Sequence, residues 1–169
     1  MSTEIRRSQD LSQEIKRKLG PGPDPFGMQA HPFSWREKDW HFFLDVDGEP
    51  VSHVGVLRHD VRVDGVPVPV AGLGGVITEP GFQGRGFAQS LLREAVAFMT
   101  DELDADFGFL FCLPRLVPFY GRLGWQTLPR PILIEQPGGV MEFPVEVMVL
   151  PLRDRPWPPG KVEAQSLPW

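Results

Sequence analysis

The sequence predicts an α+β protein in which helices flank a mixed β-sheet, within one domain of 169 residues. Alternating apolar and polar residues on both sides of Asp64-Gly65 indicate a β-hairpin, because this dipeptide favours tight hairpin turns. An apolar run over 71–78 passes through a glycine-rich loop into a segment of helical periodicity that ends near Met99. A second apolar strand, over 107–112, leads into a short helix. These three units, in this order, predict the fold class.

Before the hairpin, the sequence predicts a strand and two helices. Residues 3–7 favour a strand, and apolar residues at i, i+4 and i+8 favour a helix over 11–19. Residues 20–33 are rich in proline and glycine, and a loop of this length is often functional. Ser34 and Glu37 form a capping box, which predicts a second helix. Its apolar residues are Trp35, Trp40, Phe42, Phe43 and Leu44.

The hairpin follows a first predicted turn at Asp47-Gly48. Residues 50–58 and 61–70 read as strands around the Asp64-Gly65 turn. Prolines at 67 and 69 cannot donate to a β-ladder, so that strand is irregular or lies at an edge. The buried stripe of the helix after the glycine loop is Phe87, Leu91, Leu92, Ala95, Phe98 and Met99.

The last part of the chain predicts two strands and an irregular tail. The strands span 132–135 and 145–150. The tail, 151–169, holds five prolines and packs through Trp157. No internal repeat divides the chain, so we expect one domain over 1–169.

Composition indicates an ordinary globular protein, with 41% hydrophobic and 23% charged residues. A net charge of −5 argues against a nucleic-acid partner and fits a cationic substrate. We expect no membrane partner, because no apolar run reaches the length of a membrane span. The N-terminal residues lack the apolar core of a secretion signal, so we expect a cytoplasmic protein. The single cysteine, Cys112, lies in an apolar strand and favours a packed thiol.

The glycine-rich loop is the main functional feature. Gln83-Gly84-Arg85-Gly86-Phe87-Ala88 joins a strand to a helix, where backbone N–H groups and a helix N-terminus favour an anion such as phosphate. The loop lacks the Lys-Ser/Thr pair of a P-loop. Gln89 takes the sixth place of the dinucleotide fingerprint, which requires glycine. Taken alone, the loop leaves open a second interpretation, a glycine-rich turn before an ordinary helix.

Two motifs in this order resemble the GNAT N-acetyltransferase superfamily. The loop over 83–88 resembles the Q/R-x-x-G-x-G/A pattern that binds the pyrophosphate of acetyl-CoA. The segment over 119–125 resembles the F-Y-x-x-x-G-F/W signature, whose tyrosine lies near the CoA sulfur. The resemblance implies a twisted mixed sheet whose fourth and fifth strands splay apart to admit CoA. It also implies direct transfer of an acetyl group from acetyl-CoA to a primary amine, without a metal.

The resemblance assigns roles to residues of both motifs. Tyr120, the only tyrosine in the chain, would protonate the leaving thiolate, since a phenol with a pKa of about 10 keeps its proton at neutral pH. The alternative is a core tyrosine that packs between the short helix and the sheet. A backbone N–H near Ile77 would polarise the thioester carbonyl. The implied cofactor contacts are Val76, Ile77, Thr78, Gln83, Gly84, Arg85, Gly86, Phe87 and Ala88.

Residues 52–58, 63–65, 72–76 and 157–160 resemble segments of two further families, the aminoglycoside 2′-N-acetyltransferases and the nodulation N-acyltransferases, and this likeness is patchy over residues 25–160. These patches suggest an amino sugar or an aminoglycoside-like amine as acceptor. Asp39 matches an acidic substrate contact that lies on a helix in the aminoglycoside enzymes. Gly74 and Lys161 stand where those enzymes carry carboxylates. We therefore expect an amine of single positive charge, or an amino sugar, to react better than a polycationic aminoglycoside.

Several residues are candidates for the general base that deprotonates the amine. His53 has a suitable unperturbed pKa of about 6.5, although a histidine in an alternating strand is more often structural. We expect Asp39 and His53 to contact the acceptor, and a water chain is an alternative base. The other candidate bases are Glu79, Glu142 and Glu146. A longer acyl donor, a protein acceptor, a non-catalytic acyl-CoA sensor and a homodimer remain alternatives.

Overall fold

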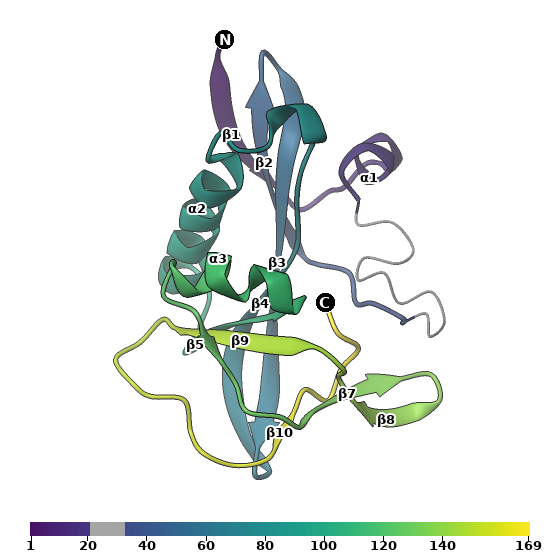
Figure 1. The fold of residues 1–169 in the computed structure, drawn as a ribbon, viewed down its shortest axis with the longest axis vertical. Helices are drawn as coiled ribbons and strands as arrows, with labels where there is room; N and C mark the ends of the chain where they lie inside the picture. Colours follow the sequence, from purple (N-terminus) through teal and green to yellow (C-terminus); the bar gives the residue numbers. More distant parts are fainter. Residues whose placement is uncertain (21–32) are drawn as a thin grey trace.

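A mixed β-sheet runs through the whole molecule and carries helices on its faces (Figure 1). The computed structural model describes residues 1–20 and 33–169, so most of the predicted functional loop at 20–33 lies outside the described residues. In the described part the sheet has ten strands, with the path β6-β9-β5-β4-β3-β10-β7-β8; β2 pairs with β3 beside this path, and β1 pairs with β2. The predicted α+β class is confirmed.

The strands are β1 (Thr3–Ser8), β2 (Trp40–Val46), β3 (Glu49–Val63), β4 (Val66–Thr78), β5 (Phe107–Cys112), β6 (Gln126–Thr127), β7 (Ile132–Gln136), β8 (Gly139–Glu142), β9 (Glu146–Pro151) and β10 (Val162–Glu163). The α-helices are α1 (Gln13–Leu19), α2 (Phe87–Asp101) and α3 (Val117–Gly121). Two short 3₁₀ helices are η1 (Pro80–Phe82) and η2 (Pro114–Leu116). In the described part of the chain, no helix is both long enough and apolar enough to span a bilayer.

The predicted turn at Asp47-Gly48 and the predicted hairpin turn at Asp64-Gly65 are both confirmed. Asp47-Gly48 joins β2 to β3, and Asp64-Gly65 joins β3 to β4. All four turn residues have positive φ, with Asp64 at 48° and Gly65 at 79°, as the tight turns of a twisted hairpin require. The predicted first helix is α1, which Ser12 caps by accepting a hydrogen bond from the backbone N–H of Ile15.

The predicted second helix, over 34–44, is wrong. Residues 33–38 have no regular structure, and β2 begins at Trp40. The run after Trp40 is buried at every residue of β2, because α2 covers one face of the strand and β1 and β3 border its edges. A continuous run of large apolar residues suits such a buried strand. The capping box at Ser34 favours a helix only locally, and the pairing of β2 with β1 and β3 outweighs it.

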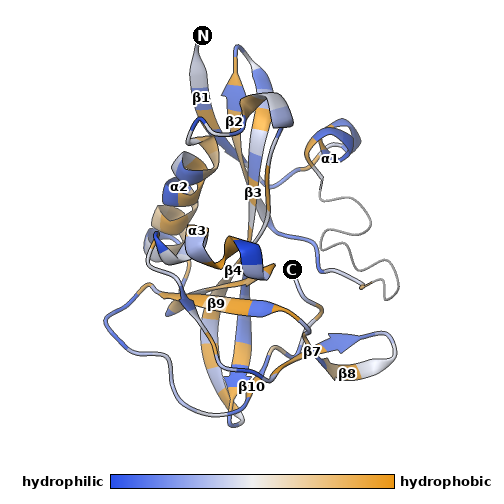
Figure 2. Cartoon of the chain, in the orientation of Figure 1, coloured by the Kyte–Doolittle hydropathy of each residue, from blue (hydrophilic) through white to orange (hydrophobic). Residues whose placement is uncertain are grey.

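Helix α2 packs on β2, β3 and β4, while α1 contacts β3 from the opposite side of the sheet in Figure 1. Figure 2 shows hydrophobic and hydrophilic stretches alternating along α2, as an amphipathic helix requires. Its buried residues are Leu91, Leu92, Ala95, Phe98 and Met99, which confirms most of the predicted stripe; Phe87 is only half-buried.

Strands β4 and β5 pair in parallel over a short stretch and then diverge. Residues 70–73 of β4 face residues 107–110 of β5, and β5 continues beside β9 alone. The predicted splay of these two strands is confirmed. Past Leu73, β4 has no strand partner on its β5 side within the described residues, which leaves backbone N–H groups on that side for a ligand.

The tail is more ordered than its prolines predict. Strand β10 inserts between β3 and β7, parallel to β7 and antiparallel to β3. The Trp157 ring lies 4.9 Å from the Phe107 ring, which confirms its predicted packing. Trp169 is buried, and its indole N–H donates to the carbonyl of Phe109 at 3.1 Å. The tail thus completes a second apolar core on the face of β5 opposite α2.

Candidate active site

A β-bulge shapes β4 at the point where β5 leaves it. His53 of β3 faces Ile77 and Gly55 faces Gly74, so Gly75 and Val76 together oppose the single residue Val54. Gly75 has a φ of 60°, which glycine adopts without the strain of a Cβ. A bulge of this kind bends its strand and changes the direction of the following backbone groups. The last residues of β4 therefore turn relative to β5.

Two buried histidines hold this bulge. His53 donates from Nδ1 to the carbonyl of Gly75 at 2.7 Å, and its Nε2 lies 2.9 Å from Nδ1 of His41. Because the carbonyl can only accept, the His53 proton sits on Nδ1 and His41 donates to Nε2. Burial lowers the pKa of His53 to about 4 and also lowers the pKa of His41, so both rings are neutral at pH 7.

The glycine-rich loop presents an open helix start. Gly84 and Gly86 have φ values of 75° and 77°, and Gly86 is the N-cap of α2 with no side-chain cap. A Cβ on either glycine would meet no described atom within 4 Å, so the space beside the loop is open. The first N–H groups of α2 are thus left for an anion. The side chain of Gln83 ties the loop to β4 by donating to the carbonyl of Thr78 at 3.0 Å.

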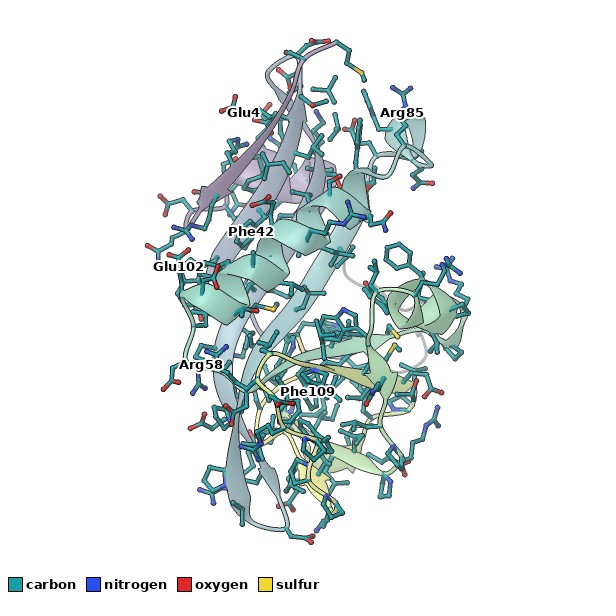
Figure 3. All side chains as sticks on the ribbon, turned by 90° about the vertical axis from the view of Figure 1, so that its left-hand side faces the viewer. Glu4, Phe42, Arg58, Arg85, Glu102 and Phe109 are labelled. Atoms are coloured by element: carbon teal, nitrogen blue, oxygen red, sulfur yellow. The ribbon has the colours of Figure 1, made fainter. Side chains whose placement is uncertain are left out.

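One cavity collects most of the predicted cofactor residues. It has a volume of about 460 Å³ and extends from the end of β4 to the start of α2. The predicted residues that line it are Val76, Ile77, Thr78, Gln83, Gly84, Gly86, Phe87 and Ala88. Arg85 does not line it: its guanidinium donates to the carbonyl of Gly81 at 3.3 Å and lies over the Phe82 ring. Figure 3 shows the Arg85 side chain pointing away from α2.

A second cavity, of about 250 Å³, lies in the gap between the diverging strands. Its walls come from residues 73–77 of β4, from residues 110–112 of β5 and from residues 113, 115 and 116 after β5. Trp35, Lys38 and Trp169 close it from the other side. The two cavities share Val76, Ile77, Leu116 and Tyr120, so they meet at the bulge.

Tyr120 is the one titratable residue that lines both cavities in the described part of the chain. It lies on α3 with 5% of its surface exposed, and its ring packs against Trp125. Burial, with the neighbouring Cys112 as a smaller cause, raises the pKa of the Tyr120 hydroxyl above its usual value. The phenol therefore keeps its proton at neutral pH. Cys112 itself is buried, as predicted, and burial raises the pKa of its thiol to about 12.

The two residues predicted to contact the acceptor line neither cavity. Asp39 is exposed and precedes β2, and it lies on no helix; its backbone N–H donates to the carbonyl of Val56. His53 is 5% exposed and lies behind the bulge, where its ring contacts Gly75 and His41. In the described structure the His53 side chain thus contacts the bulge from behind, and Asp39 contributes to neither cavity lining.

The remaining candidate bases also lie outside both cavities. Glu79 is 3.4 Å from the ammonium of Lys18, and Glu146 is 3.0 Å from Arg130. Glu142 is exposed on β8. Lys161, which entered the prediction of acceptor charge, pairs with Glu163 at 3.2 Å and does not line the second cavity; Gly74 does.

Lys38 lines the second cavity although no motif in the sequence predicts it. Its side chain lies across two glycines that face each other on β3 and β4: a Cβ on Gly55 would be 2.7 Å from Cγ of Lys38, and one on Gly74 would be 2.8 Å from Cε. Burial lowers the pKa of Lys38 to about 8. Two facing glycines in otherwise apolar strands are the signal that a side chain crosses there.

A split mixed sheet, an open helix start and a buried tyrosine lie together where the two cavities meet. Residues 25–128, more than half of the chain, match the family model of the acetyltransferase (GNAT) domain. The chain therefore belongs to the GNAT superfamily of acyltransferases. None of the curated proteins matches it.

Solved structures show the same fold at low identity. A GNAT family N-acetyltransferase (YhbS) from Escherichia coli, in complex with CoA, aligns with a TM-score of 0.64 and 17% identity over 96% of this chain and 89% of that one. Escherichia coli ElaA aligns with a TM-score of 0.58 and 17% identity over 88% and 99%. An acyl-CoA N-acyltransferase from Pseudomonas aeruginosa gives a TM-score of 0.58 and 16% identity over 88% and 99%.

Proposed function

We propose that the protein transfers the acetyl group of acetyl-CoA to the primary amine of a small molecule, such as an amino sugar. The observation that carries this proposal is the position of Tyr120, which borders both the cavity at the glycine loop and the cavity between β4 and β5. A transferase for two substrates requires two sites that meet at the reacting atoms.

The first cavity suits CoA. Backbone N–H groups over 84–88 and the start of α2 would bind the pyrophosphate, and both glycines leave room for it. The pantetheine arm would pair with residues 76–78, whose β5-facing edge has no strand partner in the described chain. The similar Escherichia coli protein YhbS was solved with CoA bound, which supports this assignment.

The chemistry follows from the junction of the cavities. The acceptor amine, in the second cavity, attacks the thioester carbonyl; the C–N bond forms and the C–S bond breaks. A backbone N–H of the bulged segment near Ile77 would bind the developing oxyanion. Tyr120 would give its proton to the leaving thiolate, which a phenol of raised pKa still holds at neutral pH.

The amine must lose a proton before it attacks. The described lining of the second cavity holds no aspartate, glutamate or histidine side chain, which favours a water chain as the route for that proton. The volume of about 250 Å³ lies below the roughly 300–1,000 Å³ of drug-sized ligand sites, so the acceptor is small. Both properties favour a simple amine over an aminoglycoside.

Release of free thiol tests the proposal. The purified protein is mixed with acetyl-CoA or longer acyl-CoAs and a panel of small amines, and the product is identified by mass. We expect acetyl-CoA to react, and its amide product to appear in step with the thiol. Tight acyl-CoA binding without turnover on any amine would instead support the non-catalytic sensor. Faster turnover of a longer acyl-CoA would move the donor assignment away from acetyl-CoA.

A further inference from the structure

The peptide group that joins Gly75 to Val76 reaches from one edge of β4 to the other. Its carbonyl oxygen accepts a hydrogen bond from Nδ1 of His53 at 2.7 Å, and His53 belongs to β3. This peptide is trans, and in a trans peptide the C=O and the N–H point in opposite directions. Because β4 lies between β3 and β5, the N–H of Val76 points towards the side on which β4 and β5 diverge.

The residues that follow in β4 support this direction. The backbone N–H of Glu79, directly after the strand, donates to the carbonyl of Val51 on β3 at 2.9 Å. The carbonyl of Thr78 instead accepts from the side chain of Gln83, on the glycine loop, at 3.0 Å. Backbone groups of successive residues in a strand face its two edges in turn. Val76 therefore faces the same open edge as Thr78.

The N–H of Val76 reaches the junction of the two cavities. Val76 and Tyr120 both line the cavity at the glycine loop and the cavity between β4 and β5. A thioester at this junction can present its carbonyl oxygen to β4 and its sulfur to Tyr120. The N–H then stabilises the oxygen as it gains negative charge, while the phenol protonates the sulfur.

The β-bulge by itself does not fix the direction of this peptide group. Gly75 has a φ of 60° and, without a Cβ, has access to more backbone conformations than other residues. Val54 of β3 opposes two residues of β4 in place of one, so the regular ladder is interrupted at this point. The hydrogen bond from His53 restrains the carbonyl of Gly75 and, through the rigid peptide plane, the N–H of Val76.

His41 in turn fixes the direction in which His53 donates. Nδ1 of His41, on β2, lies 2.9 Å from Nε2 of His53, and the two rings stack with their centres 5.2 Å apart. Since the neutral His53 donates from Nδ1, its Nε2 accepts from His41. Both histidines are buried. A chain of hydrogen bonds therefore runs from β2 through β3 to the bulge of β4.

We infer that His53 and His41 are positioning residues for acyl transfer, because they hold the carbonyl of Gly75 and so direct the N–H of Val76 at the thioester oxygen. This inference rests on the proposed function and names the donor that binds the oxyanion. Neither histidine lines a cavity, so both act through the backbone of β4 and not by contact with a substrate.

Two amide substitutions at residue 53 separate the roles of the two ring nitrogens. The side-chain nitrogen of asparagine can take the place of Nδ1, whereas that of glutamine takes the place of Nε2. His53→Asn therefore keeps a donor for the carbonyl of Gly75, and His53→Gln directs its amide towards His41. Both variants exchange a buried ring for a neutral amide, so each is the matched control of the other.

Single-turnover acyl transfer from acetyl-CoA to the preferred small amine gives the first readout. Deleting an oxyanion donor lowers kcat by about 10²–10³-fold, and misdirecting one should cost less. We expect His53→Gln to slow acyl transfer by about 10–100-fold and to leave acetyl-CoA affinity and the KM of the amine within about threefold. His53→Asn should stay within about threefold of the parent rate, and His41→Leu should lie between the two variants.

The carbonyl stretch of bound acetyl-CoA gives a second readout that needs no acceptor. A hydrogen bond to the thioester oxygen weakens the C=O bond and lowers its stretching frequency. Infrared difference spectra with acetyl-CoA labelled with ¹³C at the thioester carbonyl isolate this band. We expect a lower frequency than in free acetyl-CoA for the parent and for His53→Asn, and a frequency close to the free value for His53→Gln. If His53→Gln does not fold, His41→Leu provides the same comparison.

Two results would overturn the inference. One is an equal rate and an equal carbonyl frequency in His53→Asn and His53→Gln, which would make the histidines packing residues. The other is a weaker acetyl-CoA affinity with an unchanged rate of acyl transfer, which would place the effect on binding. Failure of the proposed function looks different, because the parent protein would then release no thiol with any amine.

Discussion

The two cavities that meet at Tyr120 are lined by different chemical groups. The cofactor cavity is lined by the backbone of β4, by the glycine loop and by apolar or neutral side chains, with no charged residue in its described lining. The second cavity, between β4 and β5, is lined in part by the charged side chains of Lys38 and Arg115, which are far apart in the sequence. The first cavity offers N–H groups that any sequence with the right backbone provides. The second offers side chains, whose chemistry depends on which residue stands at each position.

This difference between the cavities predicts the effect of a substitution in each of them. A substitution on the cofactor side acts through the backbone and alters acyl-CoA binding. A substitution on the acceptor side alters which amine reacts. A substitution at the junction alters the chemical step for every pair of substrates. The predictions below run from the largest expected effect to the smallest.

Tyr120→Phe removes a hydroxyl at the junction and keeps the ring that packs on Trp125. Turnover should fall by roughly 10²–10⁴-fold, the usual range for losing a general acid, while the acyl-CoA dissociation constant stays within a few fold. Single-turnover kinetics check this, because they report acyl transfer even where product release is slow. Unchanged single-turnover rates would make Tyr120 a packing residue.

Gly86→Asp places a carboxylate at the open start of α2, where a phosphate should bind. Two like charges about 4 Å apart oppose each other by about 4 kcal/mol near a protein surface, so acyl-CoA affinity should fall by roughly 10²–10³-fold. Gly86→Asn is the control, since asparagine has a similar size and shares the cost of a φ of 77°. Titration calorimetry with acetyl-CoA measures both. Equal losses in the two variants would show strain or bulk and not charge.

The buried His53 makes stability depend on pH. Its pKa falls from 6.5 in the unfolded chain to about 4 in the folded protein, so the unfolded state binds more protons between these values. The contribution of His53 to the free energy of unfolding is therefore fully present above pH 6.5. It decreases as the pH is lowered, by about 2 kcal/mol between pH 7 and pH 5. Urea unfolding at both pH values checks this. His53→Asn keeps a donor for the Gly75 carbonyl but does not titrate, so its stability should change less; an equal slope would contradict the assignment.

Asp39→Asn should have the smallest effect. Asp39 is exposed and lines neither cavity, so KM and kcat for a small amine should stay within about twofold of the parent. Steady-state kinetics with the preferred acceptor check this. A large rise in KM would restore the acidic contact that the sequence predicts and would weaken the contrast between the cavities.

The glycine loop and the start of α2 could be predicted because the residues that specify them are contiguous in the sequence. Six neighbouring residues, 83–88, specify the loop and the start of α2, and a second block, 119–125, places Tyr120. Short-range rules for turns and helix starts apply to such segments directly. The hairpin at Asp64-Gly65 was predictable for the same reason.

The residues that line the second cavity could not be predicted, because they are distant in the sequence and come together only in the folded sheet. The resemblance to the aminoglycoside enzymes predicts Asp39 as an acceptor contact, whereas the irregular chain before β2 places Lys38 at the cavity. Trp169 reaches the site from the end of the tail and binds the Phe109 carbonyl, 60 residues away in sequence. The bulge at Gly75 depends on the register of two long strands, and no local pattern gives that register.

The claim that the first cavity binds CoA and the second does not is tested most directly by acetyl-CoA affinity in three variants: Gly86→Asp, Lys38→Gln and Arg115→Gln. If backbone groups hold the CoA phosphates and the second cavity serves the acceptor, calorimetry will show a large loss only for Gly86→Asp. The other two variants will bind acetyl-CoA within about twofold of the parent protein. A loss of acetyl-CoA affinity in Lys38→Gln and Arg115→Gln as large as that in Gly86→Asp would contradict this account, because the cations would then bind CoA.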